Sequence, residues 1–233
     1  MALHALSAAV SGDWGEAVWR ADALARPASS AGVVATGHAL LDAELPGGGW
    51  PVGALCEILQ SHSAQSEWRL LLPALRGGVL LSQGTAWVAL IGPPHVPFGP
   101  ALAAFGLDVR QLLWVKAQTP AERLWAAEQA VRCARVAAVL AWLPQVQAAP
   151  LRRLQMAAST HAKLLFVMRP AAAQHESSPA VLRLLLMPTA AAPDALHIQV
   201  LKRRGPPLAH ALALSVGSVG KGEPCHALDS LAA

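Results

Sequence analysis

The sequence predicts an α/β protein built on a doubly wound, mostly parallel β-sheet, with helices on both faces and antiparallel strands at its C-terminal end. Beyond residue 30, short apolar runs alternate with segments of helical periodicity. The runs are continuous instead of alternating with polar residues, which is typical of strands buried on both faces of a parallel sheet. Their repeated strand–helix–strand order favours a doubly wound domain. After residue 180 the helical segments stop, which favours an antiparallel extension of the same sheet.

The first predicted strands share a short length and a partial enrichment in β-branched or aromatic residues. They are Ala54–Leu59, Trp87–Ile91, Leu112–Val115, Val136–Trp142 and Leu164–Met168. The predicted helices between them are Glu67–Leu75, Pro100–Phe105, Ala121–Cys133 and Leu151–Thr160. The predicted antiparallel strands are Val181–Met187, His197–Lys202 and Ala209–Val216.

One helix start carries a clear local signal. Thr119 precedes Pro120, and Glu122 follows three residues after the threonine. A threonine N-cap, a proline at the first helical position and a glutamate at the third form a capping box, in which two unpaired backbone N–H groups are satisfied. We therefore expect a helix to begin directly after Thr119.

Three parts are expected along the chain. Residues 1–30 form an N-terminal helix and a linker, residues 31–216 form the core, and residues 217–233 form a flexible tail of small and polar residues. Trp14 and Trp19 on the N-terminal helix are candidate contacts for a protein partner, because aromatic residues are enriched at interface hot spots.

The chain is short of charge and rich in apolar residues. Of its 233 residues, 54% are hydrophobic and 14% are charged, whereas ordinary globular proteins carry about 25% charged residues. This balance excludes a disordered chain, which needs low hydrophobicity and high charge. Because uncharged side chains must cover much of the surface, we expect a surface that contacts a partner.

The basic residues gather toward the C-terminal end. The net charge is only +4, so the distribution is more informative than the sum. A nucleic-acid-binding surface and a solvated, arginine-rich face explain this distribution equally well. The basic residues of this region are Arg152, Arg153, Lys163, Arg169, Arg183, Lys202, Arg203 and Arg204.

No metal site is expected from the cysteines and histidines. The three cysteines are far apart, and the nine histidines show no metal-binding spacing. The N-terminus lacks the pattern of a signal peptide, and prolines interrupt the longest uncharged stretch before it reaches the roughly 20 apolar residues that cross a membrane. We expect a cytoplasmic protein that does not associate with a membrane.

The segment after the first predicted core strand has the position of a phosphate-binding loop but not its residues. Such a loop needs glycines, whose backbone can approach phosphate closely, and a lysine. Residues 60–68 contain neither. Gln60 and Gln65 carry side chains where glycines are needed, and Glu67 places a negative charge where a triphosphate would lie. We therefore do not expect ATP hydrolysis.

A run of three glycines, Gly47–Gly49, is the strongest turn signal in the chain. A phosphate cradle would open directly onto a helix, whereas this run leads into a predicted strand. We interpret it as a tight turn.

The segment Thr36–Ile58, TGHALLDAELPGGGWPVGALCEI, resembles the opening of the RecA core. From about residue 18 to about residue 216 the chain resembles the ImuA family, RecA-like proteins of bacterial damage-induced mutagenesis operons. That family is itself grouped with the cell-division inhibitor SulA. Further stretches that carry the resemblance are LLLPAL (70–75), IGPPHVPF (91–98), LWAAEQAVR (124–132), AVLAWL (138–143), LRRLQMAA (151–158) and SPAVLRLLL (178–186).

The resemblance implies a RecA-like core with a degenerate nucleotide site. The phosphate-loop lysine of RecA falls on Ser66, and its neighbouring threonine falls on Glu67. The acid that closes the second nucleotide strand falls on Ala141, and the acid that activates water falls on or near Pro94. The resemblance therefore implies a protein that needs no cofactor and is not an enzyme.

The family's role, as the resemblance implies it, is that of an accessory protein in SOS-induced translesion DNA synthesis, which is a route of DNA damage tolerance and mutagenesis. Its expected partners are an ImuB-like homologue of Y-family polymerases and an error-prone replicative-type DNA polymerase, with RecA as a further candidate.

Two other functions are compatible with the sequence. A SulA-like inhibitor of cell division would act by occluding a filament-forming protein. We favour the ImuA-like role because SulA-type chains are shorter and resemble only part of this core. A DNA-dependent ATPase of the RecA class is disfavoured by the substitutions described above.

The loops of RecA that face DNA correspond to Pro144–Pro150 and Pro170–Pro179, which are shorter here and nearly neutral. Filament-type DNA binding is therefore not expected. We predict weak contact with single-stranded DNA for two groups of basic residues: those that flank these loops and those in the strand-turn at 202–204. For the strand-turn, a hairpin turn that only makes the surface soluble is an equally good explanation. These residues are Arg152, Arg153, Arg169, Lys202, Arg203 and Arg204.

Overall fold

The computed structural model of the protein describes residues 32–61, 67–76, 86–187 and 195–215. Most of its strands belong to one large sheet, and two short ones form a separate small sheet. The strands are β1 (Val33–Val34), β2 (Trp50–Pro51), β3 (Ala54–Gln60), β4 (Trp87–Ile91), β5 (Leu112–Val115), β6 (Val136–Trp142), β7 (Leu164–Pro170), β8 (Leu182–Met187), β9 (Ala195–Lys202) and β10 (Leu212–Ser215).

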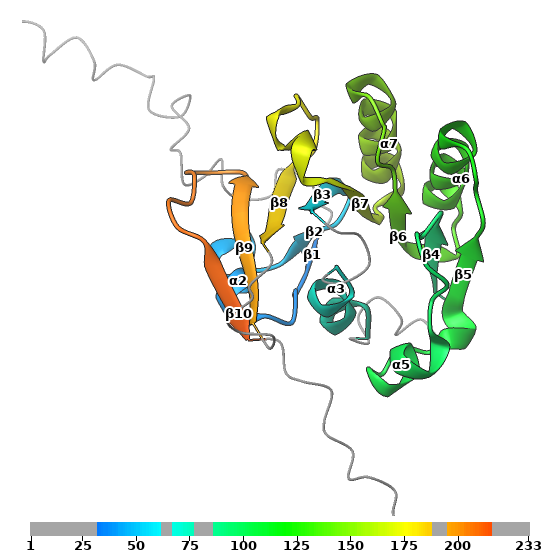
Figure 1. The fold of residues 1–233 in the computed structure, drawn as a ribbon, viewed down its shortest axis with the longest axis horizontal. Coiled ribbons are helices and arrows are strands. Elements are labelled where there is room, and N and C mark those ends of the chain that lie inside the picture. The colour runs from blue at the N-terminus through cyan, green and yellow to red at the C-terminus, as the bar shows by residue number, and fades with distance from the viewer. Residues whose placement is uncertain (1–31, 62–66, 77–85, 188–194, 216–233) are drawn as a thin grey trace, which may run out of the picture.

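The large sheet has the strand order β10-β9-β8-β3-β7-β6-β4-β5 (Figure 1). From β8 to β5 all neighbouring strands are parallel, and β9 and β10 continue the sheet in antiparallel fashion. The small sheet pairs β1 with β2 antiparallel. The mixed α/β class, the mostly parallel sheet and the antiparallel C-terminal strands are therefore confirmed.

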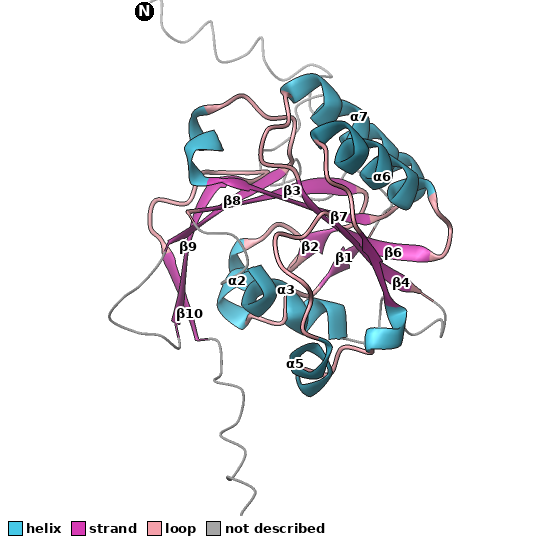
Figure 2. Ribbon diagram, turned by 45° about the vertical axis from the view of Figure 1, so that its right-hand side comes forward, coloured by secondary structure: helices cyan, strands magenta, loops and turns pink. Residues whose placement is uncertain are grey.

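Helices cover both faces of the large sheet. Figure 2 shows α6 (Pro120–Arg132) and α7 (Ala148–His161) on one face, and α2 (Ala39–Glu44), α3 (Glu67–Arg76) and α5 (Gly99–Ala104) on the other. The strand residues alternate between these two faces. Two short 3₁₀ segments complete the described elements: η1 (Val109–Gln111) and η2 (Ala171–His175).

The two sides of the sheet are packed with different kinds of side chain. Along β6, Leu140 and Trp142 pack into what we call the α3 layer, the core between the sheet and α2, α3 and α5. Trp50 and Phe166 meet edge to face in that layer, with ring centroids 5.1 Å apart. The α7 layer, between the sheet and α6 and α7, is rich in alanine. Its buried alanines are Ala89, Ala126, Ala127, Ala130, Ala141, Ala158 and Ala180.

The capping box at the start of α6 is present as predicted. The Thr119 hydroxyl accepts a hydrogen bond from the Glu122 backbone N–H at 3.2 Å. The Glu122 carboxylate in turn accepts from the backbone N–H groups of Thr119, at 3.1 Å, and Gln118, at 2.8 Å. These bonds hold the pKa of Glu122 below its ordinary value.

The glycine run forms the expected tight turn. Gly47 and Gly48 have positive φ angles of 84° and 79°, and the Gly48 N–H donates to the Leu45 carbonyl at 2.9 Å. Gly49 follows where the chain passes β1, and a Cβ added there would lie 2.3 Å from the Val34 carbonyl oxygen. The turn therefore allows β2 to pair with β1.

Some elements differ from those that the sequence predicts. The short elements α2, β1 and β2 were not predicted, and α7 begins at Ala148, ahead of the predicted Leu151. The expected N-terminal helix and linker (1–30) and C-terminal tail (217–233) lie outside the described residues. Among the residues that the structure describes, no helix is long and apolar enough to cross a membrane.

Candidate functional site

The carboxyl edge of the sheet is where a doubly wound fold binds its ligands. Gln60 ends β3 there, and its side chain is 4% exposed. Pro94 lies exposed in the loop after β4, whereas Ala141 on β6 is fully buried in the α7 layer. Of the remaining positions that correspond to the RecA nucleotide site, Glu67 begins α3, and Gln65 and Ser66 lie outside the described residues.

Glu67 is fully buried at the N-terminus of α3. Its Oε1 atom accepts a hydrogen bond from the indole Nε1–H of Trp142, at 3.2 Å. A helix N-terminus favours negative charge, and here the protein's own carboxylate occupies that position. A phosphate at the same helix end would meet a like charge, which opposes its binding.

An apolar cavity of about 240 Å³ lies beside this pair. Trp68 and Trp142 form part of its wall, with ring centroids 6.2 Å apart and planes tilted by 42°. His95 is the titratable side chain among the described residues that line it. Such a cavity suits an apolar group, and its described lining does not provide both an acid and a base for catalysis. The other lining residues are Leu72, Pro93, Pro94, Val96, Pro97, Phe98, Ala101, Leu102 and Phe105.

The prediction that Arg169 contacts DNA phosphate is wrong, because its side chain is only 2% exposed. Its guanidinium donates to the carboxylates of Glu57, at 3.3 Å, and Glu176, at 2.5 Å. It also donates to the Val146 carbonyl at 3.0 Å. The guanidinium therefore bonds groups of the protein itself and is not accessible to a phosphate.

Glu57 is the centre of a buried network that was not predicted from the sequence. Its two carboxylate oxygens accept from Arg169, from the Ser178 hydroxyl at 2.8 Å and from Arg183 Nε at 2.6 Å. Arg183 also donates to two carbonyl groups of η2, those of Ala173, at 2.7 Å, and Gln174, at 3.3 Å. The network fastens η2 and the following turn onto the sheet.

A signal for this network was present in the sequence. Glu57 and Arg183 each stand within a predicted apolar strand, and Arg169 directly follows one. Charged residues are almost never fully buried unless they are paired. The register brings them together, because Glu57 lies opposite Val167 on β7 and opposite Arg183 on β8. Which charges pair could not be derived without that strand order.

Arg152 and Arg153 are exposed on α7. Arg153 forms an ion pair with Glu128 of α6 at 3.0 Å, so one of the two predicted DNA contacts is partly engaged within the protein. Arg152 remains an exposed cation. The sites proposed for a protein partner, Trp14 and Trp19, lie outside the described residues.

The sequence Lys202-Arg203-Arg204 does not form one basic patch in space. Lys202 lies opposite Arg183 on β8, and its amine donates to the Ser178 carbonyl at 3.0 Å. Burial lowers the pKa of Lys202, and the neighbouring Arg183 charge lowers it further. Arg203 instead pairs with the Glu44 carboxylate of α2 at 3.1 Å, and the exposed Arg204 follows in the turn. Lys202 therefore lies apart from the two arginines, and of these Arg203 is paired within the protein.

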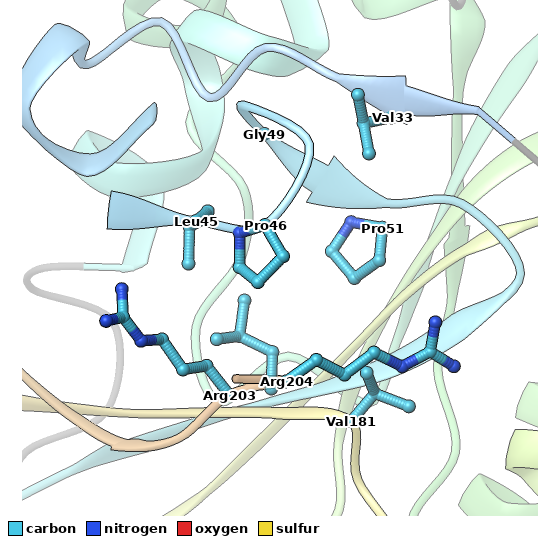
Figure 3. A pocket seen from close by; sticks show the side chains of 9 residues that line it. Val33, Leu45, Pro46, Gly49, Pro51, Val181, Arg203 and Arg204 are labelled. Atoms are coloured by element: carbon cyan, nitrogen blue, oxygen red, sulfur yellow. The ribbon is translucent and has the colours of Figure 1, made fainter. Parts of the chain in front are cut away.

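Arg203 and Arg204 line a shallow cleft, which we call the amino-edge cleft because it lies where β3 and β8 begin. Figure 3 shows it with Pro46, from the turn after α2, and Pro51 of β2 on one side and the two arginines on the other. It encloses about 30 Å³. Its other lining residues are Val33, Leu45, Gly49, Val181 and Leu182.

The described residues contain no group of three or more His, Cys, Asp or Glu side chains that could hold a metal ion. Cys56 is buried, and Cys133 is exposed. Burial raises the pKa of the Cys56 thiol well above its ordinary value.

Comparison with known proteins links the chain to SulA. No family model matches it. It is 33% identical over 101 residues to the cell division inhibitor SulA of Edwardsiella piscicida, an alignment that covers 43% of this chain and 58% of that protein. It is 28% identical over 118 residues to the cell division inhibitors SulA of Yersinia pestis (strain Pestoides F) and Yersinia pseudotuberculosis serotype O:1b, covering 51% of this chain and 68% of each relative. The chain thus spans less than two thirds of the first relative, and the similarity supports the SulA part of the resemblance.

Proposed function

We propose that this chain is a non-enzymatic protein of the SOS response that inhibits cell division in the manner of SulA, by binding a protein that forms filaments. The observation that carries the proposal is the similarity to SulA over about half of the chain. It reverses the order of preference that the sequence favoured, in which the ImuA-like role came first.

A binding role without catalysis is supported by the carboxyl edge of the sheet. The buried carboxylate of Glu67 lies at the N-terminus of α3, where a phosphate-binding site would need a positive or neutral environment. We infer that the fold is a RecA-like core whose nucleotide site has been filled by the protein's own side chains. Gln60, buried at the end of β3, and Trp142, hydrogen-bonded to Glu67, support this inference.

A protein partner is also favoured over DNA by the basic residues. The guanidinium groups of Arg169 and Arg183 are bonded to the Glu57 carboxylate. Arg183 also bonds two carbonyl groups of η2, within the segment that corresponds to a DNA-facing loop of RecA. DNA binding needs cations that can reach phosphates together. Lys202 and Arg203 instead contact different parts of the protein.

The second candidate function is the ImuA-like accessory role in translesion synthesis, with the polymerase partners named above. It is favoured by the length of chain left outside the similarity to SulA, since the alignment with the Edwardsiella protein covers 43% of this chain. The two candidates share the SOS context and differ in the partner.

Expression from an inducible promoter in a bacterium that lacks its own SulA separates the two. We expect long, undivided cells in which DNA continues to be replicated, measured by microscopy with a DNA stain. Normal cell length together with a raised frequency of damage-induced mutation would support the accessory role instead. If neither cell length nor mutation frequency changes, both candidates are wrong.

The non-enzymatic part of the proposal has its own test. Titration calorimetry of the purified chain with magnesium and ATP is expected to show no binding tighter than about 1 mM. Micromolar binding accompanied by phosphate release would overturn it. Ser66→Lys, which restores the lysine at the position to which the resemblance assigns it, provides a matched variant. We expect it to gain no ATP hydrolysis, because the glycines of a phosphate loop are missing as well.

A further inference from the structure

The amino-edge cleft combines apolar walls with positive charge. Pro46, Pro51 and Val181 face one another across it, and Arg203 and Arg204 extend along its floor in opposite directions (Figure 3). It lies at the edge of the sheet opposite the degenerate nucleotide site, because it is lined by residues that precede β3 and β8. No function described so far uses it.

The two arginines of the cleft differ in whether their charge is compensated by a neighbouring acid. Arg203 is neutralised, because its guanidinium donates to the side chain and the backbone carbonyl of Glu44. Asp42, the other acid of α2, is engaged by the Thr36 backbone N–H at 2.7 Å. Arg204 is exposed, and no hydrogen bond or ion pair ties it to the part of the chain that the structure describes. The cleft therefore presents one uncompensated cation beside an apolar wall.

We propose that the amino-edge cleft binds an extended acidic segment of a partner protein, with an aliphatic side chain between Pro46, Pro51 and Val181 and a neighbouring carboxylate on Arg204. The proposal rests on the proposed function as a protein-binding chain and names where, and with what chemistry, a partner would bind. Burial of the aliphatic side chain supplies affinity, and the carboxylate on Arg204 selects acidic sequences. The small volume limits the insertion to the end of one side chain.

A peptide fits these observations better than a nucleic acid. Single-stranded nucleic acids bind to grooves that combine a line of cations with aromatic rings for base stacking. The described lining of the cleft contains aliphatic side chains and prolines, and no aromatic ring. Lys202, the next cation along the chain, donates to Ser178 and contacts the Glu57 network instead.

The test uses a fluorescein-labelled peptide with one central leucine flanked on both sides by aspartates, titrated with the purified full chain and followed by fluorescence anisotropy. We expect binding at about 50 mM salt that weakens at about 200 mM salt. Arg204→Glu is expected to weaken it at least about fivefold, and Val33→Thr, which places a hydroxyl in the apolar wall, about threefold. Peptides with serine in place of the leucine or of the aspartates should bind more weakly.

Arg152→Glu is the matched control, because it makes the same charge reversal at an exposed arginine on α7. It is expected to leave peptide binding unchanged, and both arginine variants should unfold at the wild-type urea concentration. Equal weakening by Arg204→Glu and Arg152→Glu would show nonspecific attraction and overturn the proposal. So would the absence of peptide binding, or a tighter complex with oligothymidylate that displaces the peptide.

Failure of this inference can be told apart from failure of the proposed function. Arg204→Glu is also expressed in the cell-division assay. If the wild-type chain blocks division and Arg204→Glu blocks it equally, the cleft assignment is wrong and the proposed function stands. If the wild-type chain has no effect on division while the peptide binds as expected, the proposed inhibition of cell division is wrong and the assignment of the cleft as a peptide-binding site stands.

Discussion

The indole N–H of Trp142, the last residue of β6, donates a hydrogen bond to the carboxylate of Glu67, the first residue of α3, across 3.2 Å. Both side chains are buried, at 3% and 0% exposure. The bond joins residues 75 positions apart in the chain and ties the α3 layer to the carboxyl edge of the sheet. The N-terminus of α3, a kind of position that can bind anions, is thus occupied by a carboxylate that is bonded within the protein.

Removing the Glu67 carboxylate should therefore destabilise the fold. We expect Glu67→Leu to lower the free energy of unfolding by about 1–3 kcal/mol, because the Trp142 N–H would remain buried without its acceptor. Urea denaturation followed by tryptophan fluorescence measures this change. Glu67→Gln keeps an acceptor oxygen and should cost less. If the effects of Glu67→Leu and Trp142→Phe simply add in the double variant, the two residues are not coupled and the interpretation is wrong.

Removing one partner from the buried Glu57 network should cost more stability than replacing all of its charged residues by apolar ones. Glu57→Ala leaves the buried Arg183 guanidinium without a carboxylate and leaves Arg169 with only that of Glu176, so we expect a loss of about 3–5 kcal/mol in the free energy of unfolding. Glu44→Ala, which breaks a partly exposed pair with Arg203, is the control and should cost about 1 kcal/mol or less.

A companion variant tests the same network from the opposite direction. Replacing Glu57, Arg169 and Arg183 together by leucine or methionine should restore most of the stability lost in Glu57→Ala, because no charge is then left buried without a partner. Triple-variant stability as low as that of Glu57→Ala would contradict this explanation. Denaturation by urea, monitored by circular dichroism, compares all three proteins.

Gly49 should be intolerant of any side chain. A Cβ there would lie 2.3 Å from the Val34 carbonyl oxygen, and a backbone atom cannot yield as a flexible side chain can. We expect Gly49→Ala to break the pairing of β1 with β2 and to lower the free energy of unfolding by more than about 2 kcal/mol. Gly32→Ala is the control, since a Cβ there meets nothing within 4 Å. Equal thermal midpoints for the two variants would refute the expectation.

His38 should make stability depend on pH. Burial lowers the pKa of His38 below its ordinary value of 6.5. The unfolded chain then binds a proton more readily than the folded one, so stability is unaffected above pH 6.5 and falls as the pH drops from 6.5 toward the lower pKa of the folded state. His38→Gln retains a side chain able to bond the Leu70 carbonyl, which His38 Nε2 contacts at 3.2 Å. Urea midpoints measured between pH 7.5 and 5.5 should fall less steeply in this variant, and parallel curves would disprove the role of His38.

The central strands could be predicted because burial on both faces leaves a direct trace in the sequence. β4 and β6, which are almost entirely buried, begin and end at the predicted residues, since each is a continuous apolar run between turns. β5 also keeps its predicted bounds, but it is the edge strand of the sheet and its Leu113 and Trp114 are exposed, so the expected burial on both faces is wrong for this strand. Helix starts without a side-chain cap were harder to place. No side chain caps the start of α7, and the helix begins ahead of Pro150, a residue that the first turn of a helix tolerates.

The candidate sites were harder to predict, because they depend on which strands are neighbours. The missing glycines and lysine of residues 60–68 are visible in the sequence, but the bond from Glu67 to Trp142 is not. Arg169 was assigned to DNA because it flanks a loop. On β7 it lies opposite Leu59, two residues along β3 from Glu57, and its buried guanidinium bonds the Glu57 carboxylate. Lys202 and Arg203 are separated because β9 ends at Lys202, which pairs with Arg183 in the sheet, while Arg203 lies beyond the strand.

The alanine-rich packing of the α7 layer sets a limit on how this protein can change over evolutionary time. α6 and α7 lie against the sheet through side chains such as Ala127, Ala141 and Ala158, each of which is fully buried. Any larger residue at these positions would have to displace a whole helix, because densely packed interiors do not absorb extra methylene groups. The α3 layer, filled by leucines and aromatic rings, can exchange one large side chain for another. Divergence among relatives should therefore be concentrated on that side of the sheet, while the helices of the α7 layer drift mainly on their outer surfaces.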